Sequence, residues 1–179
     1  MKVFFDERQL GHAPTHYFRR GAAMPHQEQP QRAEILRDML ISEGFEITKP
    51  RDHGLAPIKA VHNPDYVDFL PDAHARFVES AGPEALAIPT MHPGVRRGKE
   101  PKDIHGQLGW WMTDTSTPLT EGSWDAAYWS AQTAARLLKR VLLFQQRVHR
   151  RPSSDPDLQE SRANRRGCAY RQWLARHPL

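Results

Sequence analysis

The chain changes character near Arg140. Residues 1–140 carry 17 Lys and Arg against 18 Asp and Glu, whereas residues 141–179 carry eight Arg, no Lys and three acids. The first part has the apolar periodicity and turn residues of a folded domain, while the second mixes Arg, Pro and Ser with little periodicity. We therefore expect one folded domain over residues 1–140 and an unrelated, Arg-rich tail over residues 141–179 that is disordered or frame-shifted.

The composition excludes several classes of protein. A chain of 179 residues is long enough for one domain with a core. Its single cysteine, Cys168, excludes an internal disulfide and a zinc site built from several cysteines. There is no apolar run of the roughly 20 residues that span a bilayer and no signal peptide, so we expect a cytoplasmic protein without a membrane partner. The basic surplus forms one terminal segment without interleaved aromatics, so a nucleic-acid partner is not expected.

The N-terminal segment has the pattern of a strand, a helix and a second strand. An apolar run over residues 2–5 predicts a buried strand, and the polar stretch of residues 7–29 predicts a loop. A helical spacing then runs from Pro30 to Gly44. The apolar face of this helix consists of Ile35, Leu36, Met39 and Leu40. Residues 45–48 alternate and predict the second strand, which makes an α/β fold with a parallel sheet flanked by helices.

The sequence beyond this unit is mostly helical. Residues 55–62 predict a short helix, and Asn63 followed by Pro64 is typical of the start of a longer helix, which ends at Gly82. Residues 83–122 are rich in Pro and Gly and show no clear period, so they predict a long loop, of a kind that is usually functional or disordered.

One further helix is expected after this loop. Gly122 and Ser123 cap a helix that runs to about Lys139. Residues 141–144 either extend this helix or begin a strand.

Three blocks of the sequence occur in the same order in one known family. The first is residues 24–33, ahead of the predicted first helix. The second is residues 51–70, with Val61-His62 and Tyr66, and the third is residues 89–127, with Asp103-Ile104-His105-Gly106. The chain thus resembles the N-terminal part of the histone deacetylase and acetylpolyamine amidohydrolase superfamily, and it is most similar to the acetylpolyamine amidohydrolase branch.

The resemblance covers nearly all of residues 1–140 and implies an incomplete three-layer arginase/deacetylase fold. It also implies a zinc-dependent hydrolase that removes acetyl groups from an acetylated polyamine or an acetyl-lysine-like amine. In such a site the metal lowers the pKa of a bound water, and a neighbouring His accepts a proton from that water.

The catalytic part of that family lies beyond the region of resemblance. Its metal ligands, tandem His pair and transition-state Tyr are downstream, beginning with an Arg-Pro-Pro-Gly-His-His segment shortly after Lys139. Here residues 141–152 take that place, and no two histidines of the chain are adjacent. We therefore expect no catalytic residue, no metal ligand and no bound zinc, which describes an inactive N-terminal fragment of a deacetylase. Out-of-frame translation from about residue 140 is our hypothesis for the change.

A second interpretation from a different class stays open. The chain would then be a noncatalytic binding or oligomerisation module derived from the family, with a homodimer formed through residues 83–122. The paired arginines of the tail, Arg150-Arg151 and Arg165-Arg166, either bind phosphates or belong to an extension without a function.

The resemblance places five side chains at the substrate or its channel: Arg32, His105, Trp110, Trp111 and Asp114. Arg32 would line an internal channel associated with acetate passage, or else it is an exposed arginine of the first helical turn. Asp114 would attract a cationic substrate tail at the tunnel rim. His105 stands where polyamine-active relatives often carry a carboxylate, which weakens a polyamine assignment. Trp110 and Trp111 would wall the tunnel, contact a second subunit or pack in the core.

Two groups of residues resemble metal ligands only superficially. Asp72 and His74 have the spacing of a ligand pair, but two residues apart on a helix they point in different directions. His12, His16 and His26 lie in one loop without a carboxylate at a matched spacing, so a solvated loop is the preferred interpretation.

Overall fold

The computed structural model describes residues 2–27, 29–92 and 98–150. The chain divides into two compact units, Met1–Thr133 and Ala134–Leu179. The tail arginines from Arg151 onward lie outside the described residues, and the expected boundary at residue 140 stays a prediction.

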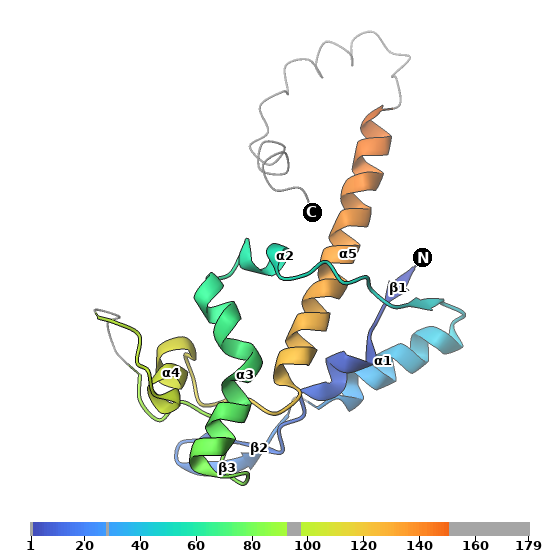
Figure 1. The fold of residues 1–179 in the computed structure, drawn as a ribbon. Helices are drawn as coiled ribbons and strands as arrows, with labels where there is room; N and C mark the ends of the chain where they lie inside the picture. Colours follow the sequence, from blue (N-terminus) through green and yellow to red (C-terminus); the bar gives the residue numbers. More distant parts are fainter. Residues whose placement is uncertain (1, 28, 93–97, 151–179) are drawn as a thin grey trace. The chain divides into compact units, whose positions relative to one another are not determined.

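The strand, helix and strand expected at the N-terminus are confirmed (Figure 1). Strand β1 (Val3–Phe4) pairs in parallel with β4 (Ile47–Thr48), with Val3 opposite Ile47, and α1 (Gln31–Ser42) lies between them in the sequence. Gly44 follows α1 with a φ of 78°, in the left-handed region that favours glycine, and so allows the chain to turn toward β4.

The prediction of a loop over residues 7–29 is wrong, because most of this segment forms regular secondary structure. It contains a short 3₁₀ helix, η1 (Glu7–Gly11), and a hairpin of β2 (His16–Arg19) and β3 (Ala22–Pro25). Its turn, at Arg20 and Gly21, has positive φ angles of 52° and 80°. The hairpin is mostly exposed, so the sequence lacks the alternation of apolar and polar residues by which a half-buried strand is recognised.

The two expected helices in residues 55–82 are confirmed as α2 (Ala56–Lys59) and α3 (Pro64–Ala81). The side chain of Asn63 accepts a hydrogen bond from the backbone N–H of Asp65 at 2.9 Å and so caps α3. At the other end Gly82 has a φ of 92°. Both boundaries therefore follow from local capping, which is why the sequence predicts them well.

The prediction of a long loop over residues 83–122 is wrong for the middle of this segment. A helix of 8 residues, α4 (Ile104–Trp111), lies there, capped by Asp103, whose side chain accepts hydrogen bonds from the N–H groups of His105 and Gly106. Its glycines indicate close packing. A Cβ atom on Gly109 would lie 1.8 Å from the carbonyl oxygen of Met91, so no larger residue fits.

The core of the described residues lies where α3 and α4 meet. Phe69, Ala73 and Phe77 recur at every fourth residue of α3 and bury one stripe of that helix. They pack against Ala87 and, from α4, against Ile104 and Leu108. Ala87 also forms a bridge with Leu119, so both ends of the 83–122 segment lie close to this core.

The last helix is longer than expected. Helix α5 (Ser123–Arg150) continues through Lys139, so residues 141–144 extend it and do not begin a strand. The residues beyond Lys139 include Leu142, Leu143, Gln145 and Gln146, which are good helix formers. Among the described residues no helix combines the length and the apolar character needed to cross a membrane.

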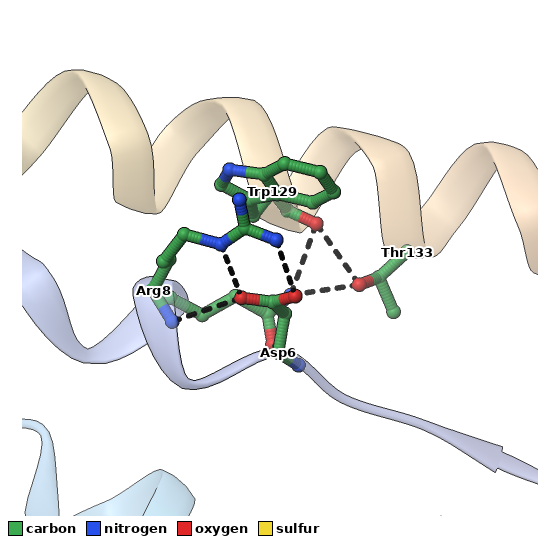
Figure 2. Close-up of polar contacts among 5 residues, drawn as sticks. Asp6, Arg8, Trp129 and Thr133 are labelled. Carbon is green, nitrogen blue, oxygen red and sulfur yellow. Dashed lines mark hydrogen bonds and ion pairs between the residues drawn. The ribbon is translucent and has the colours of Figure 1, made fainter. Parts of the chain in front are cut away.

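Side chains near the start of α5 attach it to the N-terminal segment (Figure 2). Arg8 donates two hydrogen bonds to Asp6, from Nε at 2.7 Å and from Nη2 at 2.8 Å, and its guanidinium lies 3.3 Å from the centroid of the Trp129 ring. Gln9 donates to the hydroxyl of Thr133 at 3.0 Å. These contacts hold η1 against α5 and thereby place the loop that follows η1.

Candidate functional site

A cavity of about 650 Å³ lies within the Met1–Thr133 unit. Its walls come from η1, α1, α3, the segment of residues 117–121 and the first turns of α5. The lining side chains include Leu10, His12, Arg32, Leu36, Tyr66, Leu70, His74, Glu121, Ser123 and Trp124. Segments distant in the sequence therefore converge on one mostly apolar space that carries a few polar groups, which is the usual character of a ligand site.

Helix α3 supplies one wall of the large cavity. Tyr66, Leu70 and His74 recur at every fourth residue, so they form a single stripe beside the one that enters the core. Tyr66 is half-buried, and burial raises the pKa of its phenol. Neither Leu70 nor His74 is a predicted site residue. The spacing of four would have revealed the stripe, but nothing in the sequence says that it faces a cavity.

A polar corner of the large cavity joins η1 to α5. The Nδ1 atom of His12 and the hydroxyl of Ser123 are hydrogen-bonded at 2.7 Å, and the backbone N–H of Thr120 donates to the same hydroxyl at 2.7 Å. The backbones of Gly11 and Gly122 touch here, since a Cβ atom on Gly122 would lie 2.2 Å from the carbonyl oxygen of Gly11. This contact holds the imidazole of His12 beside the start of α5.

A smaller cavity of about 200 Å³ adjoins the large one and shares Tyr66, Thr117 and Leu119 with it. Asp114 and Trp111 also line this smaller space. The Oδ1 atom of Asp114 accepts hydrogen bonds from the N–H groups of Ser116 at 2.7 Å and Thr117 at 3.2 Å. The carboxylate of Asp114 is thus positioned by the turn that follows it.

The five predicted site residues do not all meet at one place. Arg32 is exposed on the first turn of α1 and also borders the large cavity, and Asp114 and Trp111 line the small one. His105 lines neither of these two spaces: its Nε2 atom is hydrogen-bonded to the hydroxyl of Ser80 at 3.2 Å, and its ring packs edge-on against Phe77. Trp110 is also absent from the lining of both and packs edge-on against Trp111.

Trp111 has a double role in the structure. Its ring packs against the core and lies 5.9 Å from the ring of Tyr66, and its indole Nε1 donates to Glu100 at 2.7 Å. One face of this residue therefore stabilises the fold while the residue also lines the small cavity.

The described residues do not provide a metal site. No three His, Cys, Asp or Glu side chains of residues 2–27, 29–92 and 98–150 lie close enough together to hold a metal ion. His12 and His26 pack edge-on with ring centroids 6.4 Å apart, while His16 is hydrogen-bonded to Thr15. A zinc site with two carboxylates and a His does not fit this arrangement.

Asp72 and His74, which have the spacing of a metal-ligand pair, contact different groups in the structure. Asp72 approaches Arg76 at 3.9 Å, one turn along α3, and His74 lines the large cavity. The two side chains therefore have different surroundings, as their spacing on a helix requires.

Comparison with known proteins gives one consistent result. The chain is 38% identical to the acetylpolyamine amidohydrolase of Burkholderia pseudomallei over 138 residues, which are 75% of this chain and 39% of the relative. It is 34% identical over 136 residues to acetylpolyamine amidohydrolase 2 of Pseudomonas aeruginosa, with the same coverage of both chains. No family model matches the chain.

A solved structure is similar as well. The crystal structure of the acetylpolyamine aminohydrolase from Burkholderia pseudomallei superposes with a TM-score of 0.68 at 35% identity, over 76% of this chain and 40% of that one. The chain therefore spans about 39% of the length of the curated relatives that it matches.

Proposed function

We propose that this chain, which matches the N-terminal part of acetylpolyamine amidohydrolases, is one part of an enzyme that removes acetyl groups from acetylated amines. Within that enzyme it supplies walls of the substrate and product spaces. The metal and the catalytic groups come from the part of the relatives that this chain does not match.

The position of Arg32 supports this role. Its side chain comes from the first turn of α1 and borders the large cavity, close in sequence to Gln29 and Pro30, which line the same cavity. A guanidinium presents a planar fork of donors that matches a carboxylate. Arg32 therefore suits the binding of released acetate.

The smaller cavity supports a site for the amine end of the substrate. It offers the carboxylate of Asp114 beside the aromatic rings of Tyr66 and Trp111. A carboxylate attracts an ammonium group, and aromatic faces attract cations as well. His105 lies outside this space, so its replacement of a carboxylate does not remove the charge that Asp114 provides.

The chemical step itself needs groups that the described residues lack. In the family a zinc ion supplies the activated water and polarises the acetyl carbonyl. The donor set of residues 2–27, 29–92 and 98–150 does not fit such an ion. We therefore propose that hydrolysis of acetamides needs the part of the enzyme that this chain does not match.

The test is an assay of the purified chain with an N-acetylated diamine and with an acetyl-lysine reporter, alongside the full-length Burkholderia pseudomallei relative as the active control. We expect no hydrolysis above the blank and no stoichiometric zinc in elemental analysis of the isolated chain. Hydrolysis of either reporter, or one zinc ion per chain, would overturn the proposal. The cytoplasmic location expected from the sequence stays a prediction.

A second candidate is a noncatalytic module that dimerises through residues 83–122. The observation in its favour is Met91, which is 74% exposed next to the helix α4 backbone. Light scattering on the purified chain tests it: a dimer that Met91→Asp converts to a monomer supports this module, and a monomeric wild type excludes it.

A further inference from the structure

A serine and a histidine meet in the wall of the large cavity. The Nδ1 atom of His12 lies 2.7 Å from the hydroxyl oxygen of Ser123, and both side chains line the cavity. A hydroxyl within hydrogen-bond reach of an imidazole is the arrangement that activates serine as a nucleophile, because the imidazole accepts the proton as the oxygen attacks. The proposed deacetylation uses neither residue, so this pair calls for a role of its own.

The backbone holds the pair together. His12 follows Gly11 and Ser123 follows Gly122, and the two glycine backbones are in contact. A Cβ atom on Gly122 would lie 2.2 Å from the carbonyl oxygen of Gly11, and one on Gly11 would lie 3.1 Å from the carbonyl oxygen of Gly122. A larger residue at Gly122 would therefore push the two segments apart. The contact sets the distance between imidazole and hydroxyl before any substrate binds, which is the preorganisation that catalysis needs.

The surroundings of the Ser123 oxygen favour its ionised form. The backbone N–H of Thr120 donates to this oxygen at 2.7 Å, and the hydroxyl of Thr120 lies 3.0 Å from it. When the Thr120 hydroxyl donates as well, the proton of Ser123 is directed to Nδ1 of His12. Ser123 is also the first residue of α5, and the N–H groups of a first helical turn have no partner within the helix. These donors stabilise the alkoxide and suit the oxyanion of an acyl intermediate.

The lining of the cavity indicates the class of substrate. Its volume of about 650 Å³ exceeds what an acetyl group fills and leaves room for an acyl chain of several carbons. An apolar chain fits a mostly apolar wall, whereas a polyamine would lose the hydration of its ammonium groups there. The apolar side chains that line the cavity include Leu10, Leu36, Leu70, Leu119 and Trp124.

We propose that Ser123 and His12 are the nucleophile and the base of an esterase site for esters of apolar carboxylic acids. The Oγ atom of Ser123 attacks the acyl carbon, and its proton passes to Nδ1 of His12. The bond between the acyl carbon and the alcohol oxygen breaks, and this oxygen leaves with the proton from His12. Water then attacks the acyl-serine, His12 takes a proton from the water and returns it to Oγ, and the free acid leaves.

Esters rather than amides are the substrates of this pair. An alcohol or phenol leaves more readily than an amine, which has to be protonated before it departs. The pair itself uses no metal ion in either step. Its activity is therefore separate from the proposed hydrolysis of acetamides and should persist in the presence of a chelator.

Labelling with diisopropyl fluorophosphate tests the nucleophile directly. Oγ attacks the phosphorus and fluoride leaves, so a reactive serine keeps a covalent adduct that mass spectrometry locates. The purified 179-residue chain is treated with this reagent in the presence of a metal chelator. We expect one adduct per chain, on Ser123. The same chain should hydrolyse p-nitrophenyl butyrate at least about tenfold faster than the blank, and the adduct should abolish this activity.

His12→Asn separates a chemical role of the histidine from a structural one. An asparagine amide can keep a hydrogen bond to the Ser123 hydroxyl but cannot take up its proton. We expect the rates of labelling and of ester hydrolysis to fall at least about tenfold, with the thermal midpoint of unfolding unchanged. Ser123→Ala should remove the adduct and the hydrolysis altogether. Because Ser123 begins α5, circular dichroism checks that this second variant is folded.

Ser80→Ala is the matched control. Ser80 is also hydrogen-bonded to a histidine, His105, at 3.2 Å, but neither of these residues lines the large or the small cavity. Removal of its hydroxyl should leave the adduct on Ser123 and the rate of ester hydrolysis as in the wild type. Equal losses in Ser80→Ala and Ser123→Ala would show that contact with a histidine, and not the cavity site, decides the reactivity.

Other results would overturn the proposal. They are the absence of an adduct, an adduct on a different serine, and labelling of His12→Asn at the rate of the wild type. Ester hydrolysis that the chelator abolishes would assign the activity to a metal instead. The outcome is also independent of the proposed function, since a chain that is labelled on Ser123 and cleaves no acetamide supports this inference without testing the deacetylase.

Discussion

Asp6 shows how a single buried charge organises the N-terminal part of the molecule. It is only 3% exposed, and it receives the bidentate hydrogen bonds of Arg8 while it caps η1 (Figure 2). Arg8 stacks on Trp129, so the carboxylate is held through the arginine against α5. The role of these three residues is not predictable from the sequence, since the pairing of Asp6 with Arg8 is local but the stacking on Trp129 is not.

The Asp6 and Arg8 pair predicts a loss of stability in acid. The hydrogen bonds from Arg8 hold the pKa of Asp6 below its usual value of 3.8. A carboxylate whose pKa is lower in the folded state stabilises the fold above its unfolded pKa, and the stabilisation is lost as the pH falls through the folded pKa. We expect urea unfolding to show a drop in stability between about pH 5 and about pH 2 that is smaller in Asp6→Asn.

Asp38→Asn is the control for this experiment. Asp38 is also paired with an arginine, Arg37, but its side chain is 64% exposed. Exposed pairs contribute little to stability, so this variant should keep the acid dependence of the wild type. An unchanged acid dependence in Asp6→Asn would contradict the role assigned to the buried pair.

At the scale of elements, the packing of α4 on α3 holds the segment of residues 83–122 in place. Leu108 is fully buried in the core, whereas Leu36 on α1 is 58% exposed. Replacing leucine by alanine removes the same atoms at both positions. A difference between the two effects on stability therefore reports how closely each leucine is packed. It also tests whether the α1 face is uncovered in the isolated chain.

We expect Leu108→Ala to lower the free energy of unfolding by about 2 to 5 kcal/mol, because it leaves a cavity between α3 and α4. Leu36→Ala removes the same atoms from an exposed position and should change it by less than about 0.5 kcal/mol. Chemical denaturation measures both. A large loss for Leu36→Ala would show that its face is already covered.

The elements predicted correctly share a local cause. The helices α1, α2 and α3 and the strands β1 and β4 begin and end at capping, proline or glycine signals within a few residues of their bounds. Helix α4 was missed because its glycines are also loop signals. Only the approach of the Met91 backbone explains why Gly109 has to be a glycine within a helix.

At the scale of the whole molecule, the relatives match only part of the chain, and its composition changes along its length. The match to the Burkholderia pseudomallei relative covers 75% of this chain, and the Lys-free, Arg-rich sequence begins just after residue 140. A shift of reading frame replaces related sequence by unrelated sequence at one point, whereas gradual divergence does not.

The hypothesis of out-of-frame translation predicts a result at the level of the gene. Translation of the nucleotide sequence beyond codon 140 in the other two frames should recover a segment with adjacent histidines, like the one expected after Lys139. Resequencing of the region is the measurement. If neither frame contains such a segment, the tail is a genuine extension and the frame hypothesis fails.

The amino-acid sequence by itself determined the strand, helix and strand order, the capped ends of α3 and the kinship with the amidohydrolases. These depend on neighbouring residues or on the order of short blocks. Only the tertiary structure decided that Arg32, Tyr66 and Ser123 border one cavity, that His105 lies apart from Asp114 and that the apolar face of α1 is bare. Such features depend on which distant segments pack together, and local spacing carries no information about that.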